Sequence, residues 1–516
     1  MEHEGLVPAR PFRPRCCPCD GGAGGLSRRG FLGMAAGGAA VLGLSYSLVK
    51  AAEAEVAGGA PAPPRLPLVV KPILTYEVPS RRNQTSWRSW GGIETQAQAT
   101  EEVARIQGEL DKLRAAADFP LAFLPVAAVR GAGEVAKLDD LAKADAFILY
   151  AAGGGALDAV VKLGKPCIFF IRHKSGPVYL WYEIISPRFL RAHGDRLAQT
   201  TVNDNDVVVD VPDEMLWRLR ALCGLKNTMG ARIVTIGGAS GWAQANAPAL
   251  AKERFKLDIQ DVPYKDLAEL IKAARADKAA AQLAKERAAA YLKAEGVKLE
   301  TKPEYVENCF LLEQVLRGIM AKFQTRHITI NNCMGTIMPI AETTACLTLC
   351  LLNDAGYNAF CESDFVVVPS GMLLNGITGL PTFLNDPTYP HHNVITLAHC
   401  TGPRRMDGKA LEPVRIMTHF ESDYGAAPKV EMRKGQKVTN ILPDFAAKRW
   451  VGLAAEIVDA PFLQICRDQI DVQFKPDAQL VAERMPGFHW MTGYGDYRRE
   501  LAYALRRTPI AWEDLG

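Results

Sequence analysis

Acidic and imidazole side chains that could hold a metal gather in the last two-fifths of the chain. Six of the nine histidines lie there, and carboxylates are interleaved with them. These residues end three apolar runs, Tyr357–Asp364, Pro381–Asp386 and Gly487–Trp490. Two carboxylates, Glu362 and Asp386, with the imidazole of His489 suit one divalent cation. The pattern predicts an enzyme, although each acid could instead cap a turn or a helix.

Both carboxylates follow a predicted strand, Glu362 after the run 356–361 and Asp386 after the next one. In open α/β sheets, ligands bind beside the carboxyl ends of the strands. Two carboxylates beside one cation suit proton abstraction next to a carbonyl, because the cation neutralises the developing enediolate while a carboxylate carries the proton. We therefore expect Glu362 and Asp386 to line one site.

Four further residues are weaker candidates for contacts to a substrate: Asn332, His392, His399 and Trp490. Asn332 ends the strand expected to lie beside that of Glu362, and His392 follows a proline-rich loop. His399 lies in an apolar strand and Trp490 at a strand end. Burial in the core explains the position of each at least as well as contact with a substrate does.

His419, Glu421 and Asp423 alternate along one predicted strand, so their side chains share a face. A second metal site could form there, but we favour hydrogen bonding within the β-rich part of the chain.

The composition is that of an ordinary globular protein with several domains. The chain has 516 residues, of which 48% are hydrophobic and 23% charged, and this length favours two to four domains. Residues 1–54 hold six Lys/Arg and four Asp/Glu, so the remainder carries a net charge of only +1. This balance argues against a nucleic-acid partner.

The N-terminus has the features of a twin-arginine export signal. Arg28 and Arg29 precede the uncharged stretch Gly33–Val49, and small residues at 52–54 offer a cleavage site. We therefore predict a signal peptide at 1–54, read by the twin-arginine translocation machinery, and a linker at 55–65.

Export by this route predicts a periplasmic or otherwise exported protein. Gly30–Val49 is also long enough to serve as an uncleaved membrane anchor, although it is rich in glycine. Because the route carries folded proteins, a weakly held cation such as Mn²⁺ could be bound before export and so be protected from competing metals.

The cysteines do not predict a disulfide framework. Three of the twelve precede the twin arginines, and the other nine form no CxxC pair. An odd number in mostly apolar runs indicates small core residues instead.

Apolar runs alternate with helical stretches from residue 66 to residue 377, which predicts parallel α/β sheets. Strands are expected at 66–76, 120–129, 146–150, 166–172, 232–238, 257–262, 327–332 and 356–361. Helices are expected at 95–116, 242–255, 265–296, 305–323, 339–354 and 366–377.

From about residue 378, short β-prone runs dominate, at 394–398, 414–418, 429–433, 451–458 and 471–474, before a closing helix at 497–507. The predicted fold class is α/β: two doubly wound α/β domains, at 66–225 and 226–377, and a β-rich C-terminal domain at 378–516. The glycine turns at 153–155 and 237–241 do not spell a phosphate-binding motif, so no nucleotide site is expected.

The acids and histidines lie in motifs that resemble the L-fucose isomerase and L-arabinose isomerase superfamily. The motifs run in matching order over about residues 325–505: Cys361-Glu-Ser-Asp364, Leu384-Asn-Asp386, Leu397-Ala-His-Cys-Thr-Gly402, Thr418-His-Phe-Glu421, Gly435-Gln-Lys-Val-Thr439 and Gly487-Phe-His489. Over residues 65–320 the resemblance is architectural.

The resemblance implies that Glu362, Asp386 and His489 bind Mn²⁺ or another divalent cation, and that the two carboxylates are the acid and base of an aldose–ketose isomerase. The cation would bridge O1 and O2 of an open-chain sugar while the proton passes between C1 and C2 through a cis-enediol. A homo-oligomer acting on a small-molecule sugar is implied as well.

Two features depart from that family, namely a first α/β domain without matching motifs and the signal peptide. Two other interpretations stay open: an exported carbohydrate-binding protein without turnover, and an epimerase or lyase that uses the same metal site. The two carboxylates and the histidine favour an enzyme, because a pure binder needs no metal cluster.

Overall fold

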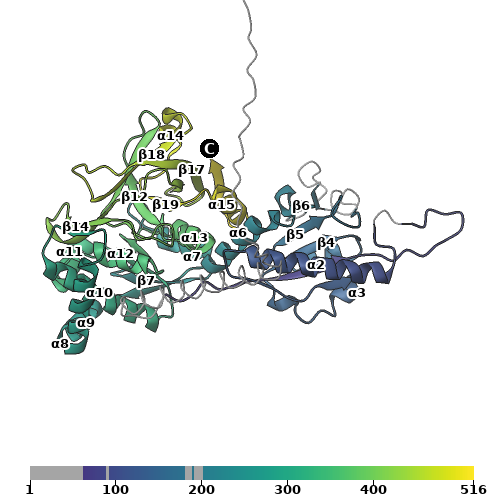
Figure 1. Ribbon diagram of the computed structural model, residues 1–516, viewed down its shortest axis with the longest axis horizontal. Coiled ribbons are helices and arrows are strands. Elements are labelled where there is room, and N and C mark those ends of the chain that lie inside the picture. Colours follow the sequence, from purple (N-terminus) through teal and green to yellow (C-terminus); the bar gives the residue numbers. More distant parts are fainter. Residues whose placement is uncertain (1–61, 89–91, 180–188, 191–201) are drawn as a thin grey trace, which may run out of the picture. The chain divides into compact units, whose positions relative to one another are not determined.

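The computed structural model describes residues 62–88, 92–179, 189–190 and 202–516. These residues belong to one compact unit, Ala57–Gly516, which holds two parallel sheets, a closed antiparallel barrel and a small mixed sheet (Figure 1). The predicted signal peptide, with its twin arginines and the candidate membrane anchor, lies outside the described residues.

The first sheet is parallel throughout and has the strand order β2-β1-β4-β5-β6, with β3 also paired to β1. Its strands are β1 (Leu68–Thr75), β2 (Leu121–Phe123), β3 (Ala127–Val129), β4 (Ala146–Ala151), β5 (Cys167–Ile171) and β6 (Val207–Val209). The strand expected at 120–129 is split into β2 and β3 around Pro125, whose ring removes a backbone donor.

Helix α2 (Gln96–Ala116) confirms the helix expected at 95–116. Thr95 and Gln98 form a capping box at its N-terminus, and one face of the helix, with Ile106, Leu110 and Leu113, is buried. The shorter helices of this part are α3 (Ala132–Val135), α4 (Leu157–Val161) and α6 (Glu214–Thr228), with 3₁₀ turns at Leu141–Lys143 and Asp204–Asp206.

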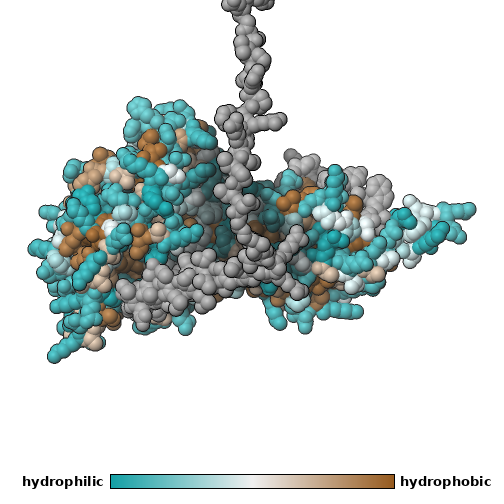
Figure 2. Space-filling model, viewed as in Figure 1, coloured by the Kyte–Doolittle hydropathy of each residue, from teal (hydrophilic) through white to brown (hydrophobic). Residues whose placement is uncertain are grey.

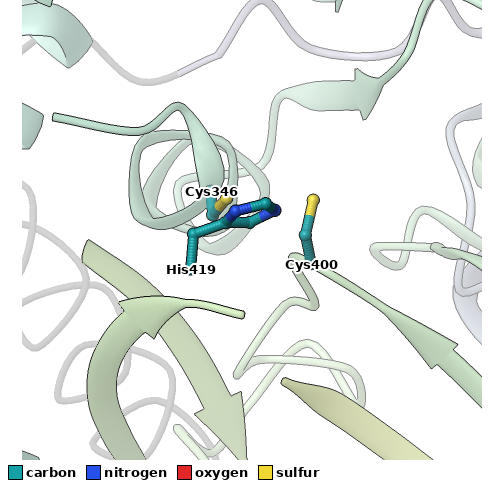
Figure 3. Close-up of side chains that lie close together, drawn as sticks. All are labelled: Cys346, Cys400 and His419. Atoms are coloured by element: carbon teal, nitrogen blue, oxygen red, sulfur yellow. The ribbon is translucent and has the colours of Figure 1, made fainter. Parts of the chain in front are cut away.

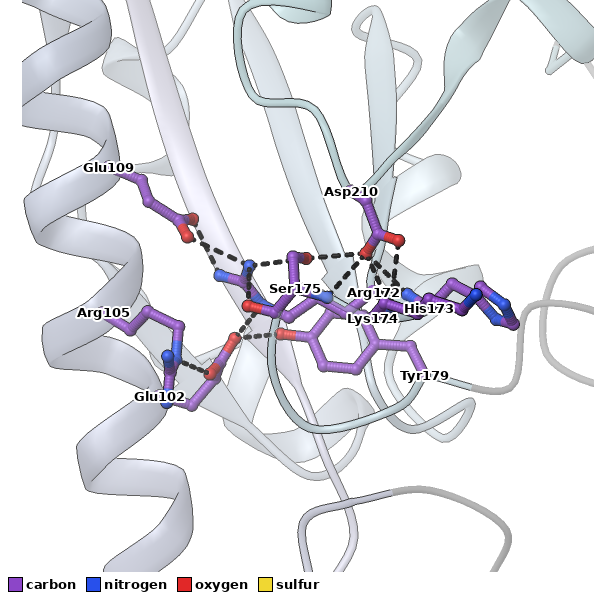
Figure 4. A network of polar contacts seen from close by, with 9 residues as sticks. All are labelled: Glu102, Arg105, Glu109, Arg172, His173, Lys174, Ser175, Tyr179 and Asp210. Atoms are coloured by element: carbon purple, nitrogen blue, oxygen red, sulfur yellow. Dashed lines mark hydrogen bonds and ion pairs between the residues drawn. The ribbon is translucent and has the colours of Figure 1, made fainter.

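A buried polar network ties α2 to the chain that follows β5 (Figure 4). The fully buried guanidinium of Arg172 pairs with Glu102 at 2.5 Å and with Glu109 at 2.7 Å, and the hydroxyl of Tyr179 donates to Glu102. Asp210, just after β6, accepts backbone N–H groups of the turn that follows Arg172. Because a buried charge without its partner is costly, these contacts hold α2 in place on the sheet.

The second sheet is also parallel, in the order β11-β10-β7-β8. Its strands are β7 (Arg232–Ile236), β8 (Asp258–Val262), β10 (His327–Ile330) and β11 (Asn358–Cys361). The helices between and after them are α7 (Ala247–Phe255), α8 (Tyr264–Ala276), α9 (Lys278–Leu292), α10 (Pro303–Lys322), α11 (Cys333–Ala341), α12 (Cys346–Asp354) and α13 (Val368–Thr378).

Two predicted helices of this part are each divided in the structure. The stretch 265–296 breaks at Asp277, whose carboxylate accepts the N–H groups that open α9. The stretch 339–354 is replaced by α11 and α12, which are separated by a turn in which Glu342 has a φ of +54°. The side-chain cap at Asp277 and the left-handed backbone at Glu342 therefore interrupt helices that the residue pattern predicted to be continuous.

The C-terminal part forms a six-stranded antiparallel barrel. Its strands are β12 (Phe383–Pro387), β13 (Val394–His399), β16 (Lys437–Pro443), β17 (Arg449–Asp459), β18 (Asp468–Phe474) and β19 (Trp490–Tyr494). They follow the order β16-β19-β12-β13-β18-β17, and the pairing of β17 with β16 closes the ring, so no edge of these strands is left open. The added strand β20 (Ala511–Asp514) runs parallel to β17, and the helices here are α14 (Ala478–Arg484) and α15 (Arg498–Leu505).

The predicted α/β class with a β-rich C-terminal part is confirmed at the level of parallel sheets followed by a barrel. Two strands of the barrel, β16 and β19, were not predicted, and the strand expected at 429–433 lies earlier, as β15 (Tyr424–Val430). β15 pairs with β14 (Val414–His419), which in turn pairs with β9 (Val297–Leu299). This small sheet crosses the predicted domain boundary at 377/378.

On the face shown in Figure 2, hydrophobic residues are interspersed among hydrophilic ones. In the part of the chain that the structure describes, no single helix is long and apolar enough to cross a membrane; α11 and α12 reach that length only together, and they meet at 88°.

Candidate functional site

The turn after β11 presents two acidic side chains from a strained backbone. Glu362 has a φ of +68° and Ser363 a φ of +51°, a conformation that non-glycine residues adopt only when their surroundings enforce it. The loop after β7 enforces this conformation. The hydroxyl of Ser363 donates to Gly238 O at 2.9 Å, and Ser240 N donates to Ser363 O at 3.1 Å. The loop thus fixes the positions of Glu362 and Asp364.

His489 lies at the centre of a cluster of three carboxylates. Its Nδ1 is 2.6 Å from Asp364 Oδ2, and its Nε2 is 3.3 Å from both Glu362 Oε2 and Asp386 Oδ1. The register of the barrel explains the last contact: β12 pairs with β19 so that Asn385 faces Trp490, and Asp386 and His489 are the next residues along these two strands. The structure therefore brings together all three residues that we predicted to bind a metal.

Asp364 orients the imidazole of His489. Both residues are nearly inaccessible, with 2% and 4% of their surfaces exposed. A carboxylate that holds one ring nitrogen of a histidine fixes the tautomer and turns the other nitrogen to a ligand. Here Nε2 is turned towards Glu362 and Asp386, which is the arrangement expected of a metal-binding histidine.

The charges in the cluster shift the pKa values of its members. Burial opposes a charge on His489, but Asp364, Glu362 and Asp386 outweigh burial and raise the pKa of His489 to about 10. Burial also opposes ionisation of Glu362, yet the contacts to His489 and His399 hold its pKa below the usual value. For Asp386, burial dominates and raises the pKa. Three carboxylates around one imidazole thus favour a positive charge between them.

His399 joins this cluster more closely than its sequence context indicated. Its Nε2 lies 3.7 Å from Glu362 Oε1, and one ligand atom each from Glu362, His399 and His489 lie within 4.8 Å of one another. The side chain comes from the end of β13, where Ala398 pairs with Asp386. His399 could therefore bind the same cation or a substrate held by it.

Trp242 is an aromatic residue of the site that sequence patterns did not indicate. It lies in the loop between β7 and α7, its side chain is 66% exposed, and its ring meets that of His489 edge-on at 6.0 Å. A hydrogen bond from the indole also helps to lower the pKa of Glu362. The run Gly237–Gly241 marked this loop as a tight turn, but nothing in the sequence pointed its tryptophan to the site.

The remaining candidate contacts lie in different surroundings. Trp490 is fully buried in the core of the barrel, which agrees with its interpretation as a core aromatic residue and leaves its ring inaccessible to a sugar. His392, with a φ of +48°, is exposed in the turn between β12 and β13. Asn332 is exposed at the start of α11, where its side chain lies over its own helix, beside Gly335. Substrate contacts of Asn332 and His392 stay predictions.

The residues of the cluster fit a divalent cation. Carboxylate oxygens and imidazole nitrogens are suitable ligands for such an ion, and Asp364 supplies the outer carboxylate that metal-binding histidines require. Buried cysteines and histidines next to the cluster form two further groups that could bind a metal: Cys361 with His399 and Cys400, and Cys346 with Cys400 and His419.

Comparison with known proteins gives a partial similarity to a sugar isomerase. A sulfoquinovose isomerase from Clostridium sp. (strain MSTE9) is 30% identical to the chain over 181 residues. The match covers 33% of this chain and 40% of that protein, so the chain spans about two fifths of its length. No protein-family model matches the chain.

The comparison corrects the family resemblance drawn from the motifs. The relative found is a sulfoquinovose isomerase, and no family model supports the L-fucose and L-arabinose isomerases. Our prediction of that superfamily was therefore wrong. Short motifs such as Leu384-Asn-Asp386 and Gly487-Phe-His489 do not define a family by themselves.

Proposed function

We propose that this protein is a sugar isomerase-like enzyme that interconverts an aldose and a ketose through a cis-enediol. Two observations support the proposal: the partial similarity to a sulfoquinovose isomerase, and the cluster of Glu362, Asp386 and His489 at the ends of their strands. The cluster carries most of the argument, because two carboxylates 3.3 Å from one imidazole nitrogen supply both a cation site and proton carriers.

A divalent cation bound by Glu362, Asp386 and His489, such as Mn²⁺, would polarise the carbonyl and hydroxyl oxygens of an open-chain sugar. The side chains supply the proton transfers. One of the two carboxylates takes the proton from C2 and returns it to C1, and the other moves the hydroxyl proton from O2 to O1. His489, held by Asp364, keeps both carboxylates facing the same point.

The accessible positions of the two acids suit these roles. Both side chains are partly exposed, Glu362 by 27% and Asp386 by 43%, whereas His489 and Asp364 behind them are buried. The sugar would therefore meet the two acids from the solvent side. The exposed indole of Trp242 lies on this side as well and offers an apolar face to a sugar ring.

Deuterium incorporation tests the proposal. Full-length protein, stripped with a chelator and reloaded with Mn²⁺, is incubated in deuterated water with a panel of aldoses that includes sulfoquinovose. Ketose formation with solvent deuterium at C2 of the recovered aldose supports an isomerase. Binding of a sugar without exchange would contradict it and would indicate a carbohydrate-binding protein; exchange that yields an epimer or an eliminated product would replace the isomerase with an epimerase or a lyase.

A matched pair of variants assigns the proton transfer. Glu362→Gln should abolish turnover, because the amide cannot accept the proton. Glu456→Gln, an exposed acid on β17, should retain it. Full activity of Glu362→Gln would place the chemistry elsewhere.

We further propose that residues 1–54 direct export through the twin-arginine pathway, on the basis of Arg28, Arg29 and the uncharged stretch that follows. A reporter fused after residue 65 should reach the periplasm of a bacterial host. It should remain in the cytoplasm when both arginines are changed to lysine, and export of that double variant would refute the assignment.

A further inference from the structure

A second cluster of ligand atoms has no part in the proposed isomerisation. Cys346, Cys400 and His419 each offer one sulfur or nitrogen atom, and these atoms all lie within 4.8 Å of one another. The residues come from three elements: Cys346 opens α12, Cys400 follows β13, and His419 ends β14. In Figure 3 the two thiols flank the imidazole of His419.

Both thiols and the imidazole are buried, and neither cysteine forms a disulfide. The exposed fractions are 1% for Cys346, 5% for Cys400 and 3% for His419, and both cysteines are free. A thiol packed alone in a core behaves as a small apolar group. Two thiols and an imidazole that converge from three separate elements have, in addition, the donor types of a closed metal site.

Neighbouring groups position these donors for an ion. Nδ1 of His419 is 3.0 Å from the hydroxyl oxygen of Ser422, and its Nε2 is 3.9 Å from Glu421 Oε2. When Nδ1 donates to Ser422, Nε2 keeps its lone pair for a ligand. The hydroxyl of Thr401 donates to the carbonyl of Cys346 at 2.7 Å. That bond holds the first turn of α12 against the segment that carries Cys400.

A further thiol stands next to the trio. Cys361 Sγ lies 3.7 Å from Cys400 Sγ. Among the described residues, Cys361 groups with Cys400 and His399 rather than with Cys346 and His419, so it lies next to the trio without belonging to it.

We propose that Cys346, Cys400 and His419 form a binding site for one thiophilic closed-shell cation, Zn²⁺ or Cu⁺. Thiolate and imidazole ligands select such soft cations, whereas the oxygen-rich cluster around His489 suits harder ones. The two sites therefore bind different metals.

The position of the site gives the ion a structural task. The ion would join α12, the helix that precedes β11 of the second parallel sheet, to the ends of β13 and β14. His399 connects it to the carboxylate cluster, because its Nδ1 lies 3.5 Å from Cys400 Sγ and its Nε2 lies 3.7 Å from Glu362 Oε1. A bound ion would therefore help to fix the position of the turn that carries Glu362.

Metal analysis of the purified full-length protein tests the site. The protein is stripped and then loaded separately with Zn²⁺ and, under anaerobic reducing conditions, with Cu⁺; the cation retained through gel filtration identifies the ligand. We expect the wild type to retain one equivalent more than Cys346→Ser, Cys400→Ser and His419→Gln, because an ion bound by the carboxylate cluster is common to all four proteins. Cys350→Ser, a fully buried cysteine of the same helix, is the matched control and should retain the ion.

Two further measurements keep the result decisive. Cobalt loaded into the wild type should show a thiolate-to-metal charge-transfer band in the near ultraviolet, and this band should survive Glu362→Gln but not Cys400→Ser. Where a variant does not fold, alkylation of the wild type replaces it: bound Zn²⁺ or Cu⁺ should protect Cys346 and Cys400 from modification.

Three results would overturn the proposal. These are a wild-type protein that retains neither cation, a Cys400→Ser variant that retains as many equivalents as the wild type, and a disulfide between Cys361 and Cys400 in freshly purified protein.

Discussion

The Nδ1 atom of His489 lies 2.6 Å from Oδ2 of Asp364, although the two residues are 125 positions apart in the chain. Asp364 belongs to the turn after β11 in a parallel sheet, and His489 immediately precedes β19 of the barrel. The contact therefore joins the two architectures at the candidate site, and it sets the direction of the nitrogen that faces Glu362 and Asp386.

Replacing this carboxylate tests its positioning role, on the premise of the proposed isomerase. Asp364→Asn keeps the size of the side chain but removes the charge that fixes the histidine, so affinity for the divalent cation and turnover should each fall by about 10–100-fold. Cation titration and steady-state kinetics measure the two effects. Asp423→Asn, a carboxylate in the turn after β14, is the control, and cation affinity equal to the wild type in Asp364→Asn would rule out the role.

The exposed ring of Trp242 offers a second test. Removal of an aromatic face that stacks on a sugar costs about 1 kcal/mol, so Trp242→Ala should raise KM about fivefold with a smaller change in kcat. Trp242→Phe, which keeps an aromatic face, should recover most of the loss. If the alanine variant bound sugar as tightly as the wild type, Trp242 would not be part of the binding surface.

The packing of α6 against α13 predicts a large effect from one methyl group. A Cβ added at Gly224 would lie 2.2 Å from Ile377 Cγ1 and 2.8 Å from its backbone nitrogen. Gly224→Ala should therefore destabilise the protein by about 1–3 kcal/mol. Gly108→Ala, in α2 and with nothing within 4 Å of the new Cβ, should instead stabilise it by about 0.5–1 kcal/mol. Denaturant unfolding of both variants checks the opposite signs.

The buried acid Asp468 should make stability depend on pH. Burial raises its pKa to about 7, even though Val430 N donates to it and Lys429 is near. Because this pKa is above that of an aspartate in the unfolded chain, the native state binds the proton more tightly. The stabilising contribution of protonated Asp468 is therefore fully present below about pH 4 and is lost as the pH rises through about 7.

Asp468→Asn should remove that dependence. Between pH 5 and pH 8 the wild type should lose about 3 kcal/mol of stability that the variant keeps. Unfolding midpoints measured at both pH values give the difference. Parallel pH profiles for the two proteins would show that Asp468 is ionised at no extra cost in the native state.

The local patterns of the sequence predicted most of the elements. Alternation of apolar runs with helical stretches indicated the strands of both parallel sheets except β6, and it indicated the helix that the structure shows as α2. The same patterns placed Glu362 at the end of a strand and Asp386 in the neighbouring apolar run. These inferences hold because hydrophobic periodicity and capping depend on residues within one or two turns of each other.

Contacts between distant segments could not be predicted in this way. The residues of β16 and β19 carry weak strand patterns, and they are strands because pairing with β17 and β12 completes the barrel. The short strand β9 likewise exists through its pairing with β14, more than a hundred residues later. Such pairings depend on tertiary packing rather than on local propensity.

The sequence by itself determined the types and order of the residues that can do chemistry: Glu362, Asp386 and His489, and the free cysteines of apolar runs. Only the tertiary structure decided which of them meet. It added Asp364 and Trp242 to the carboxylate cluster, buried Trp490, and brought Cys346, Cys400 and His419 together. The reason is physical: a side chain's partners are set by the register of the strands and the packing of the helices, and these are properties of the whole fold.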